Sequence, residues 1–600
     1  MEPVRPVSRS GFLPPLALTY FDTLIKEAYA PVIIQEPIVS SANRRIHARL
    51  KMNTNPSFRD MLARVSVLFK FEQRVFGLIV SYALAIGLFS LIVPLTVQEL
   101  VNTFAFSIQP IMIVTLAAIM VLTLLCVGAF RALQFYAVEI LERRIFARIA
   151  LALTQLLPRL QVQGFLPRYA NYFFETVLLQ RSLSVLLVDV INVLVGGMVG
   201  MTILVMYHPY FLIFNTLLMA GFALIVTVLS HGALKSTIEM SHAKYDTLHW
   251  LQEISFNLPH FKATVSEPLL LKKTDELVGY YVAARRTRFQ ILIRQYLSSV
   301  GWQALVHSSL IGTAGWLLST GQLTLGQLVA AEVIVGSLLI NFDSVVKRMG
   351  YVFYFLNALT ELDFLFSLPR DTSATTVSVT LPDPRIHGLR LMCKDLSFSF
   401  PGSSPEFAHF NLDVSPGEKI AIFSNTSMGK TSLARVLAGL YLPTSGVIRY
   451  NGIDVRDLDM PSLNAYRGLV LDSQLSLFEG TLEENITLDR PSLTYEDITW
   501  ALRFVELEEE VEAFPLGLKT PVRPQGKALT VTQIQKILVA RAIVTRPQLL
   551  IFDGTLHSLH PNTREAILRR LCSKEEPWSV LFVSNDPGLT SHVDRRFILD

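Results

Sequence analysis

The chain has 600 residues, of which 51% are hydrophobic and only 17% are charged. Average soluble domains carry about 25% charged residues, so this composition argues against a soluble protein and indicates a membrane protein. The formal net charge of +4 is small for this length and argues against a nucleic-acid partner. Cys126, Cys393 and Cys572 lack the spacing of a metal site or a disulfide framework, so we expect three small buried thiols.

Residues 1–55 are expected to form a cytoplasmic N-terminal extension, and an amphipathic helix near 56–72 is expected to lie along the membrane. Crossing a bilayer core of about 30 Å takes roughly 20 apolar residues in a helix. Six stretches meet this description, and the last of them is the shortest. The predicted spans are 75–97, 110–130, 186–207, 210–229, 297–318 and 325–341. Together they predict a transmembrane domain over 56–366.

The connections between the spans differ sharply in basic residues. Lys and Arg are absent from three short connections, at 98–109, 208–209 and 319–324. Residues 131–185 contain seven of them and residues 230–296 contain nine. Because basic loops stay on the cytoplasmic side, both termini are predicted to be cytoplasmic, in a plasma (inner) membrane protein.

The two basic connections are too long for simple loops and are mostly free of Gly and Pro. We expect long helices that extend from the membrane into the cytoplasm and return. Aromatic residues gather at the far tips, around 167–174 and 252–258. These tips are predicted to dock on another surface, or alternatively to cap the helical hairpins locally.

Glu332 interrupts the sixth predicted span, and an ionisable residue inside a membrane is a functional-site hypothesis by default. It could contact a cationic substrate, pair with an Arg or with His307, or lie near the outer water boundary. Asp189 and Arg131 lie near the inner boundary and are expected to be structural.

A polar, Pro-containing linker over 367–387 precedes a predicted α/β domain over 388–600. Within this domain, 418–423 predict a strand, 424–429 a loop and 430–440 a helix. The loop ends in Gly429-Lys430-Thr431, the ending of a phosphate-binding loop. The N-terminus of such a helix attracts phosphate. Lys430 would then reach the outer phosphates, and the Thr431 hydroxyl would hold Mg²⁺.

A second element supports a nucleotide site. The run 549–553 (LLIFD) predicts a buried strand that ends in Asp553, a carboxylate placed to bind the water shell of the metal. The two elements together predict ATP and Mg²⁺ as cofactors.

With these elements in place, the chain resembles an exporter-type ABC half-transporter over residues 56–600, with similarity to type I secretion and multidrug exporters. The stretches 321–329 (GQLTLGQLV) and 477–486 (LFEGTLEENI) also carry the resemblance. It implies an α-helical membrane domain of six transmembrane helices with long cytoplasmic helical extensions, fused to an α/β P-loop ABC ATPase-like domain. The hairpin tips would be coupling helices that dock on nucleotide-binding domains.

The resemblance also implies the nucleotide contacts. Phe400 matches the aromatic residue that stacks on adenine, although it could be a plain core residue. The implied metal ligands are Thr431 and Asp553. The full set of implied contacts is Phe400, Ser424, Asn425, Thr426, Ser427, Met428, Gly429, Lys430, Thr431, Ser432 and Asp553.

The sequence departs from the family pattern within the loop and at the catalytic positions. Ser424 and Ser427 stand where glycines are usual, and we expect weaker nucleotide binding because glycine tolerates positive φ. Gly554 replaces the glutamate that polarises the attacking water, so no catalytic residue is predicted there. Asn585 replaces the histidine that senses the γ-phosphate.

Two further family motifs are altered. Val531 and Thr532 replace two glycines of the signature motif, which contact the nucleotide bound by the partner domain. Ser473 takes the place of the Q-loop glutamine, although the adjacent Gln474 could substitute for it.

These observations predict an ABC exporter that works as a homodimer or as a heterodimer with another half-transporter, with ATP binding retained and hydrolysis weak or impaired. The alternative is a pseudo-ATPase with a structural or regulatory role beside another subunit. A channel built on the same fold has no positive signal in the sequence. Membrane lipid and, in a bacterium, a periplasmic adaptor are the other expected partners. Similarity to secretion exporters favours a protein or peptide substrate.

Overall fold

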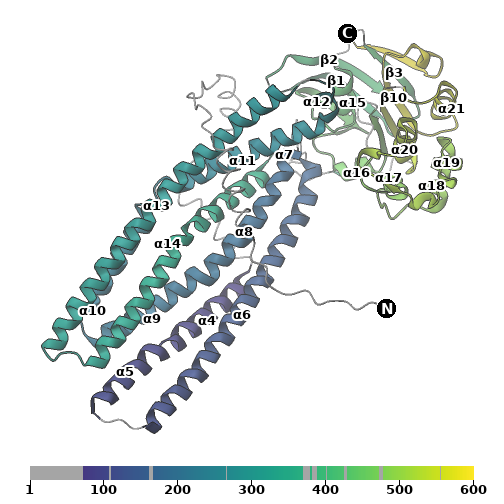
Figure 1. Cartoon of the computed structure of the whole chain (residues 1–600). Helices are drawn as coiled ribbons and strands as arrows, with labels where there is room; N and C mark the ends of the chain where they lie inside the picture. Colours follow the sequence, from purple (N-terminus) through teal and green to yellow (C-terminus); the bar gives the residue numbers. More distant parts are fainter. Residues whose placement is uncertain are drawn as a thin grey trace, which may run out of the picture. The chain divides into compact units, whose positions relative to one another are not determined.

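The computed structural model describes residues 72–106, 110–160, 167–264, 266–368, 379–381, 388–400, 402–424, 429–471, 477–554 and 556–599, except for the side chains of 104–106, 167 and 168 (Figure 1). The predicted N-terminal extension and, apart from Glu72, the predicted amphipathic helix lie outside these residues. The chain divides into two compact units. One comprises Met1–Thr154 and Phe165–Ser367, and the other comprises Gln155–Gly164 and Leu368–Asp600.

The first unit is helical, and its helices are drawn from purple to teal in Figure 1. A π-helical turn, Leu186–Val190, joins α8 to α9, and Gly232 with φ +85° separates α10 from α11. The helices are α4 (Gln73–Ser90), α5 (Ile92–Phe106), α6 (Pro110–Leu156), α7 (Pro167–Ala170), α8 (Phe174–Val185), α9 (Ile191–Tyr207), α10 (Tyr210–Thr227), α11 (Ala233–Phe256), α12 (Leu258–Ala263), α13 (Glu267–Ser319) and α14 (Leu325–Ser367).

Five helical stretches of the described residues are long and apolar enough to cross a membrane: Gln73–Thr103, Pro110–Arg159, Asn171–Tyr207, Tyr210–Thr227 and Leu325–Ser367. Each of them overlaps one of the six predicted spans. The remaining predicted span, 297–318, lies within α13, which is not among the five. Gln303, His307 and several Ser and Gly residues make this part of α13 less apolar than the others. The sixth span therefore stays a prediction.

The predicted helical extensions are present. Helix α6 runs through 47 residues and α13 through 53, which at 1.5 Å per residue gives about 70 and 80 Å. Both are far longer than the bilayer core requires. They pack beside α14, α11 and α8 through buried aliphatic and aromatic side chains such as Leu179, Leu310 and Val335.

Three of the singled-out membrane residues make close side-chain pairs. Asp189 pairs with Arg348, which agrees with the structural role expected for Asp189. Glu332 pairs with His307 across α14 and α13, with Oε1 at 3.2 Å from Nδ1, so pairing is the alternative that the structure shows. The three cysteines are free, but Cys126 is exposed on α6 and Cys572 is half-buried, so the expectation of three buried thiols holds only for Cys393.

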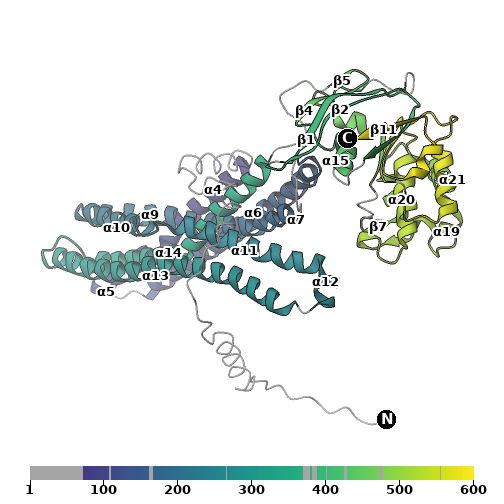
Figure 2. The ribbon, with the colours of Figure 1, turned by 90° about the horizontal axis from the view of Figure 1, so that it is seen from above.

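The second unit contains two main sheets (Figure 2). An antiparallel sheet has the order β2-β1-β4-β5, and a parallel sheet has the order β11-β3-β10-β9-β6. A short pair, β7 with β8, is antiparallel. The strands are β1 (Leu391–Ser399), β2 (Pro405–Val414), β3 (Lys419–Ser424), β4 (Ser445–Tyr450), β5 (Ile453–Asp454), β6 (Arg467–Leu471), β7 (Gly480–Thr481), β8 (Pro521–Val522), β9 (Leu549–Asp553), β10 (Ser579–Val583) and β11 (Arg595–Leu599).

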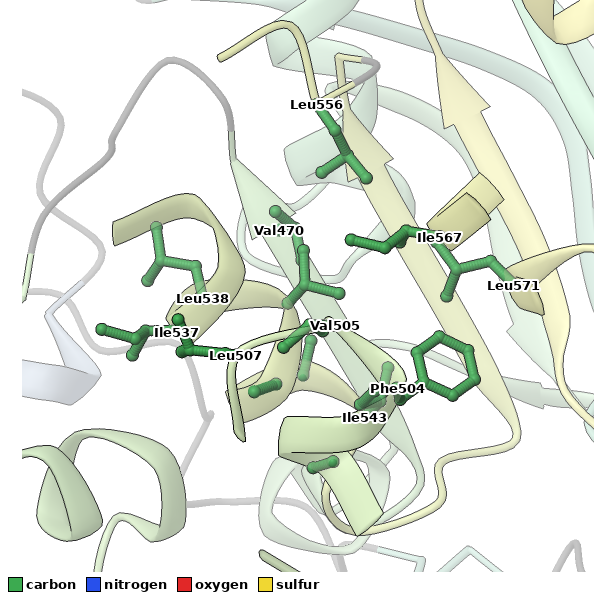
Figure 3. Packing of buried hydrophobic residues seen from close by; sticks show 14 of the residues in the cluster. Val470, Phe504, Val505, Leu507, Ile537, Leu538, Ile543, Leu556, Ile567 and Leu571 are labelled. Carbon is green, nitrogen blue, oxygen red and sulfur yellow. The ribbon is translucent and has the colours of Figure 1, made fainter. Parts of the chain in front are cut away.

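Helices cover the parallel sheet and close two hydrophobic cores. The helices are α15 (Lys430–Leu437), α16 (Met460–Asn464), α17 (Leu482–Thr487), α18 (Tyr495–Phe504), α19 (Glu508–Glu512), α20 (Val531–Ile543) and α21 (Pro561–Leu571). In one core, Val470 of β6 lies among side chains of α20 and α21, including Ile537 and Ile567 (Figure 3). Strands β9 and β10 are fully buried, which explains why they read as continuous apolar runs.

Candidate nucleotide-binding site

The predicted site gathers at one edge of the parallel sheet. Strands β3, β9 and β10 are parallel neighbours, so their carboxyl ends meet at the same edge. Ser424, Asp553 and Val583 end these strands, and α15 begins just beyond this edge. In open α/β sheets, ligands bind at this kind of edge. The sequence-predicted strand and helix are therefore placed as a phosphate site requires.

Gly429 is the N-cap of α15 and has φ +82°, a left-handed conformation that favours glycine. A Cβ atom at this position would lie 2.5 Å from the backbone oxygen of Glu406. Conformation and space therefore both require glycine here. Lys430 follows as the first, half-buried residue of α15. The preceding loop residues Asn425, Thr426, Ser427 and Met428 lie outside the described residues.

The two predicted metal ligands lie together. The Thr431 hydroxyl donates a hydrogen bond to Oδ1 of Asp553 at 3.1 Å, although 122 residues separate them in sequence. A hydroxyl and a carboxylate oxygen are hard oxygen ligands of the kind that Mg²⁺ takes, together with water and phosphate. Thr431 and Asp553 thus fit a Mg²⁺ ion bound beside the phosphates.

Ser424 does not have the backbone conformation that the sequence analysis expected at this position. It is 4% exposed, ends β3 in register with Leu599 and is not among the residues with positive φ. The positive-φ argument against serine therefore does not apply at this position. Its backbone N–H donates to Oδ1 of Asn585 at 3.0 Å. Asn585, the residue predicted to replace the switch histidine, thus bonds to the end of the strand from which the predicted phosphate loop begins.

Phe400 follows β1 and is half-buried. Its ring packs edge-on against Phe398, with centroids 5.1 Å apart, and against Tyr441, with centroids 6.2 Å apart. It therefore forms the rim of a core, and its partly exposed ring leaves surface for an adenine to stack on.

The position after Asp553 has no side chain with which to activate water. Gly554 donates its N–H to the backbone oxygen of Val583 at 3.1 Å, and its φ is +122°. L-residues rarely adopt this conformation, so the backbone as well as the missing side chain distinguishes this position from one that carries a glutamate.

The segment that resembles the signature motif begins α20. Thr530 caps this helix in a reciprocal capping box with Gln533. Val531 is 55% exposed, and the Thr532 hydroxyl donates to the Ser558 oxygen at 2.9 Å. Both residues keep their backbone N–H groups, but the exposed isopropyl group of Val531 occupies the surface that a glycine would leave open. Ser473 and Gln474 lie outside the described residues.

Sequence reasoning missed Glu406. It is the second residue of β2, and its Oε2 accepts a hydrogen bond at 3.4 Å from the hydroxyl of Ser432, a buried residue in the first turn of α15. Glu406 lies 23 residues before Gly429 in the chain, outside any motif. Only the packing of β2 against the helix start reveals it.

Comparisons with known proteins agree with this geometry. The profile of the ABC transporter family matches residues 407–557, which include Gly429-Lys430-Thr431 and Asp553. Residues 407–557 therefore form a domain of the ABC transporter family. The structure also superimposes on that of a bacterial Atm1-family ABC exporter with ATP bound, with a TM-score of 0.76 and 17% identity, covering 91% of this chain and 94% of the other.

The sequences of curated relatives align with more of the chain than the family profile does. The leukotoxin export ATP-binding protein of Aggregatibacter actinomycetemcomitans is 26% identical over 59% of this chain and 50% of its own length. The mitochondrial iron-sulfur clusters transporter of Neurospora crassa is 29% identical over 45% of this chain and 38% of its own length. The alpha-hemolysin translocation ATP-binding protein of Escherichia coli is 24% identical over 59% and 50%. The chain spans about half the length, or less, of these relatives. Together with the apolar helices, they identify an integral membrane protein.

Proposed function

We propose that this ABC protein is an exporter-type half-transporter, which moves a substrate across a membrane as a dimer. It binds ATP with Mg²⁺ and hydrolyses it slowly. The exporter fold, the apolar helices and the pairing of Thr431 with Asp553 support this proposal. Two relatives are named for leukotoxin export and alpha-hemolysin translocation, so we include a polypeptide in the proposed substrate class.

The observation that carries the proposal of slow hydrolysis is Gly554. Lys430, Thr431 and Asp553 can hold the phosphates and the metal ion, which neutralises the charge of the phosphates when bound. The next step requires a group that orients the attacking water. Gly554 offers none, and the loss of a positioned base costs about 10²–10⁴-fold in rate. The Asn585 amide cannot replace it, because a neutral carboxamide does not act as a base near pH 7.

The dimer would not repair this loss. In the ABC family, by resemblance, the phosphate loop of one domain faces the signature motif of the other. A homodimer would thus combine Gly554 with Val531 and Thr532 in both sites. In a heterodimer with an intact half-transporter, one site would contain Gly554 and the other would face Val531 and Thr532. In both kinds of dimer, ATP would therefore bind but would be hydrolysed slowly.

The alternative function is that of a pseudo-ATPase, in which nucleotide binding stabilises an assembly and drives no transport. The exposed Val531 side chain favours it, because an apolar branched group stands where glycine would let the partner's nucleotide approach the backbone. The two functions differ in one measurable respect. A transporter moves substrate when ATP binds, and a pseudo-ATPase does not.

The proposal is tested with purified full-length protein reconstituted in vesicles, alone and with an intact half-transporter. ATP binding and hydrolysis are measured for the wild type, for Lys430→Ala and for Lys574→Ala, a control that removes an exposed lysine far from the site in sequence. We expect Mg²⁺-dependent ATP binding that only Lys430→Ala weakens. Turnover should be about 10⁻³–10⁻¹ s⁻¹, which is 10²–10⁴-fold below the median enzyme. Turnover near 10 s⁻¹ that Lys430→Ala abolishes would refute slow hydrolysis. Failure to bind ATP at millimolar concentration would refute the binding part.

A gain-of-function variant sharpens the test. Gly554→Glu adds the missing carboxylate but places it on a backbone with φ +122°. We expect this variant to unfold at a lower temperature, because a non-glycine residue in this conformation is strained by about 1–3 kcal/mol. We also expect it to recover little ATPase activity, because the strained backbone would not hold the carboxylate in position to activate water. Full activity without loss of stability would show that the backbone at 554 adapts freely.

A further inference from the structure

Glu406 lies at an irregularity of the antiparallel sheet, beside the candidate nucleotide site. In the ladder of β1 with β2, Phe398 faces Phe407. The next residue of β1, Ser399, faces Pro405, so one step along β1 matches two steps along β2. Glu406 is therefore the extra residue of a β-bulge. A bulge bends its strand and re-aims a side chain, and bulges are frequent beside active sites.

The backbone and the side chain of Glu406 both lie against the start of α15. Its backbone oxygen approaches Gly429 so closely that a Cβ atom there would be 2.5 Å away. Its Oε2 accepts a hydrogen bond at 3.4 Å from the hydroxyl of Ser432, the third residue of α15. Gly429 caps this helix and Lys430 begins it. The Glu406 carboxylate is therefore held beside the helix N-terminus, at the phosphate end of the candidate site.

The second oxygen of this carboxylate is available to a ligand. Among the residues that the structure describes, Oε2 accepts the bond from Ser432 and Oε1 accepts none. Glu406 is half-buried, and its Oε1 is not one of the fully enclosed polar atoms, so a ligand can reach it. An ionised carboxylate accepts hydrogen bonds and donates none. The ligand atom that pairs with Oε1 must therefore be a donor.

The two ends of the proposed nucleotide place its sugar near Glu406. The adenine is expected on the partly exposed ring of Phe400, and the outer phosphates are expected at Lys430. Phe400 and Glu406 flank the connection between β1 and β2, and Glu406 also touches the first turn of α15. The ribose joins the base to the phosphates and lies between them. Phosphate oxygens only accept, so the ribose hydroxyls are the donors of ATP on this side of the base.

From these observations we infer that Glu406 accepts a hydrogen bond from a ribose hydroxyl of the bound nucleotide and makes the site select ribonucleotides. The bond from Ser432 orients the carboxylate through Oε2, and Oε1 receives the hydroxyl. A carboxylate binds a ribose hydroxyl in the same way in dinucleotide-binding folds. The inference rests on the proposed ATP binding and deepens it. It concerns nucleotide specificity and is independent of hydrolysis.

The test measures the affinities of ATP, 2′,3′-dideoxyATP and inorganic pyrophosphate, each with Mg²⁺, for purified full-length protein by isothermal titration calorimetry. We expect the wild type to bind ATP about tenfold tighter than dideoxyATP, as the loss of a hydrogen bond to a charged group implies. Glu406→Gln keeps the size and one acceptor, so the ratio should fall to about two- to threefold. Glu406→Ala should bring it to about one. Pyrophosphate has no ribose, so neither variant should weaken its binding, and its retention shows that the site is folded.

The matched control is Glu575→Gln. Glu575 is exposed and precedes β10, so it lies towards the amino end of that strand, whereas the candidate site gathers at the carboxyl ends. This variant should leave the ratio of the ATP and dideoxyATP affinities unchanged.

Three outcomes would overturn the inference. Equal affinities of the wild type for ATP and dideoxyATP would refute the ribose contact and leave the proposed ATP binding intact. If Glu406→Ala tightens all three ligands by one common factor, the carboxylate repels phosphate and does not recognise the sugar. If the wild type binds none of the three ligands, the proposed function fails and the inference fails with it.

Discussion

Replacing Gly429 by alanine isolates the contribution of one backbone position to the nucleotide site. Gly452, in the turn between β4 and β5, has nearly the same conformation, with φ +84° against +82° at Gly429. A Cβ at 452 meets nothing within 4 Å, whereas a Cβ at 429 lies 2.5 Å from the Glu406 oxygen. The two variants therefore share the conformational cost and differ in the clash.

The expected magnitudes follow from these two terms. A left-handed alanine costs about 1–2 kcal/mol, which is the whole effect expected for Gly452→Ala. The clash with a backbone atom adds about 1–3 kcal/mol for Gly429→Ala, because β2 or α15 must shift. In a unit of this size, 1 kcal/mol lowers the unfolding temperature by about 2–4 °C. Gly429→Ala should thus unfold about 2–12 °C below Gly452→Ala.

The assay is differential scanning calorimetry of the purified full-length protein, followed by titration with a fluorescent ATP analogue. Nucleotide affinity should fall only in Gly429→Ala, since movement at Glu406 displaces the start of α15. Equal unfolding temperatures and equal affinities for the two variants would refute the reasoning, because the close approach of Glu406 would then carry no free energy.

Two further predictions concern the metal pair and a buried thiol. Thr431→Val and Asp553→Asn should reduce the ratio of ATP affinity with Mg²⁺ to that in EDTA by about 10–100-fold, and an equal loss under both conditions would contradict the metal role. Burial raises the pKa of the Cys393 thiol to about 12, against about 8.5 in an unfolded chain. The folded protein thus holds the thiol protonated, and this contribution to stability is present below about pH 8.5 and is lost as the pH rises towards 12. At pH 9, in a background of Cys126→Ser and Cys572→Ser, alkylation of Cys393 should be about 10³-fold slower than in urea-unfolded protein, and comparable rates would show that the site is open.

Local pattern was sufficient to locate the strands and helices of the phosphate site. The apolar run 549–553 coincides with β9, and Lys430 begins α15 as predicted, although the helix ends at Leu437 and not at 440. These elements are predictable because a buried parallel strand and a glycine-capped helix each have a sequence pattern that is recognisable within a few residues. The family motifs likewise depend on short spacing, and the prediction that Gly554 and Asn585 replace catalytic residues rests on that spacing.

Contacts between distant residues were not predictable in the same way. The bond from Ser424 to Asn585 spans 161 residues, and the approach of Glu406 to Ser432 joins two elements whose sequences share no motif. The pairing of His307 with Glu332 was one of several alternatives until the packing of α13 against α14 selected it.

The sequence by itself determined that this is a membrane protein with an ABC-type domain, because composition, span length and motif spacing are local properties of the chain. The tertiary structure decided that Ser424 has an extended backbone, that Gly554 does not, and that Asn585 accepts a hydrogen bond from Ser424 at the end of β3. These are consequences of how parallel strands place their carboxyl ends at one edge of a sheet. Residues that are remote in the chain acquire a common environment there, and no local pattern encodes it.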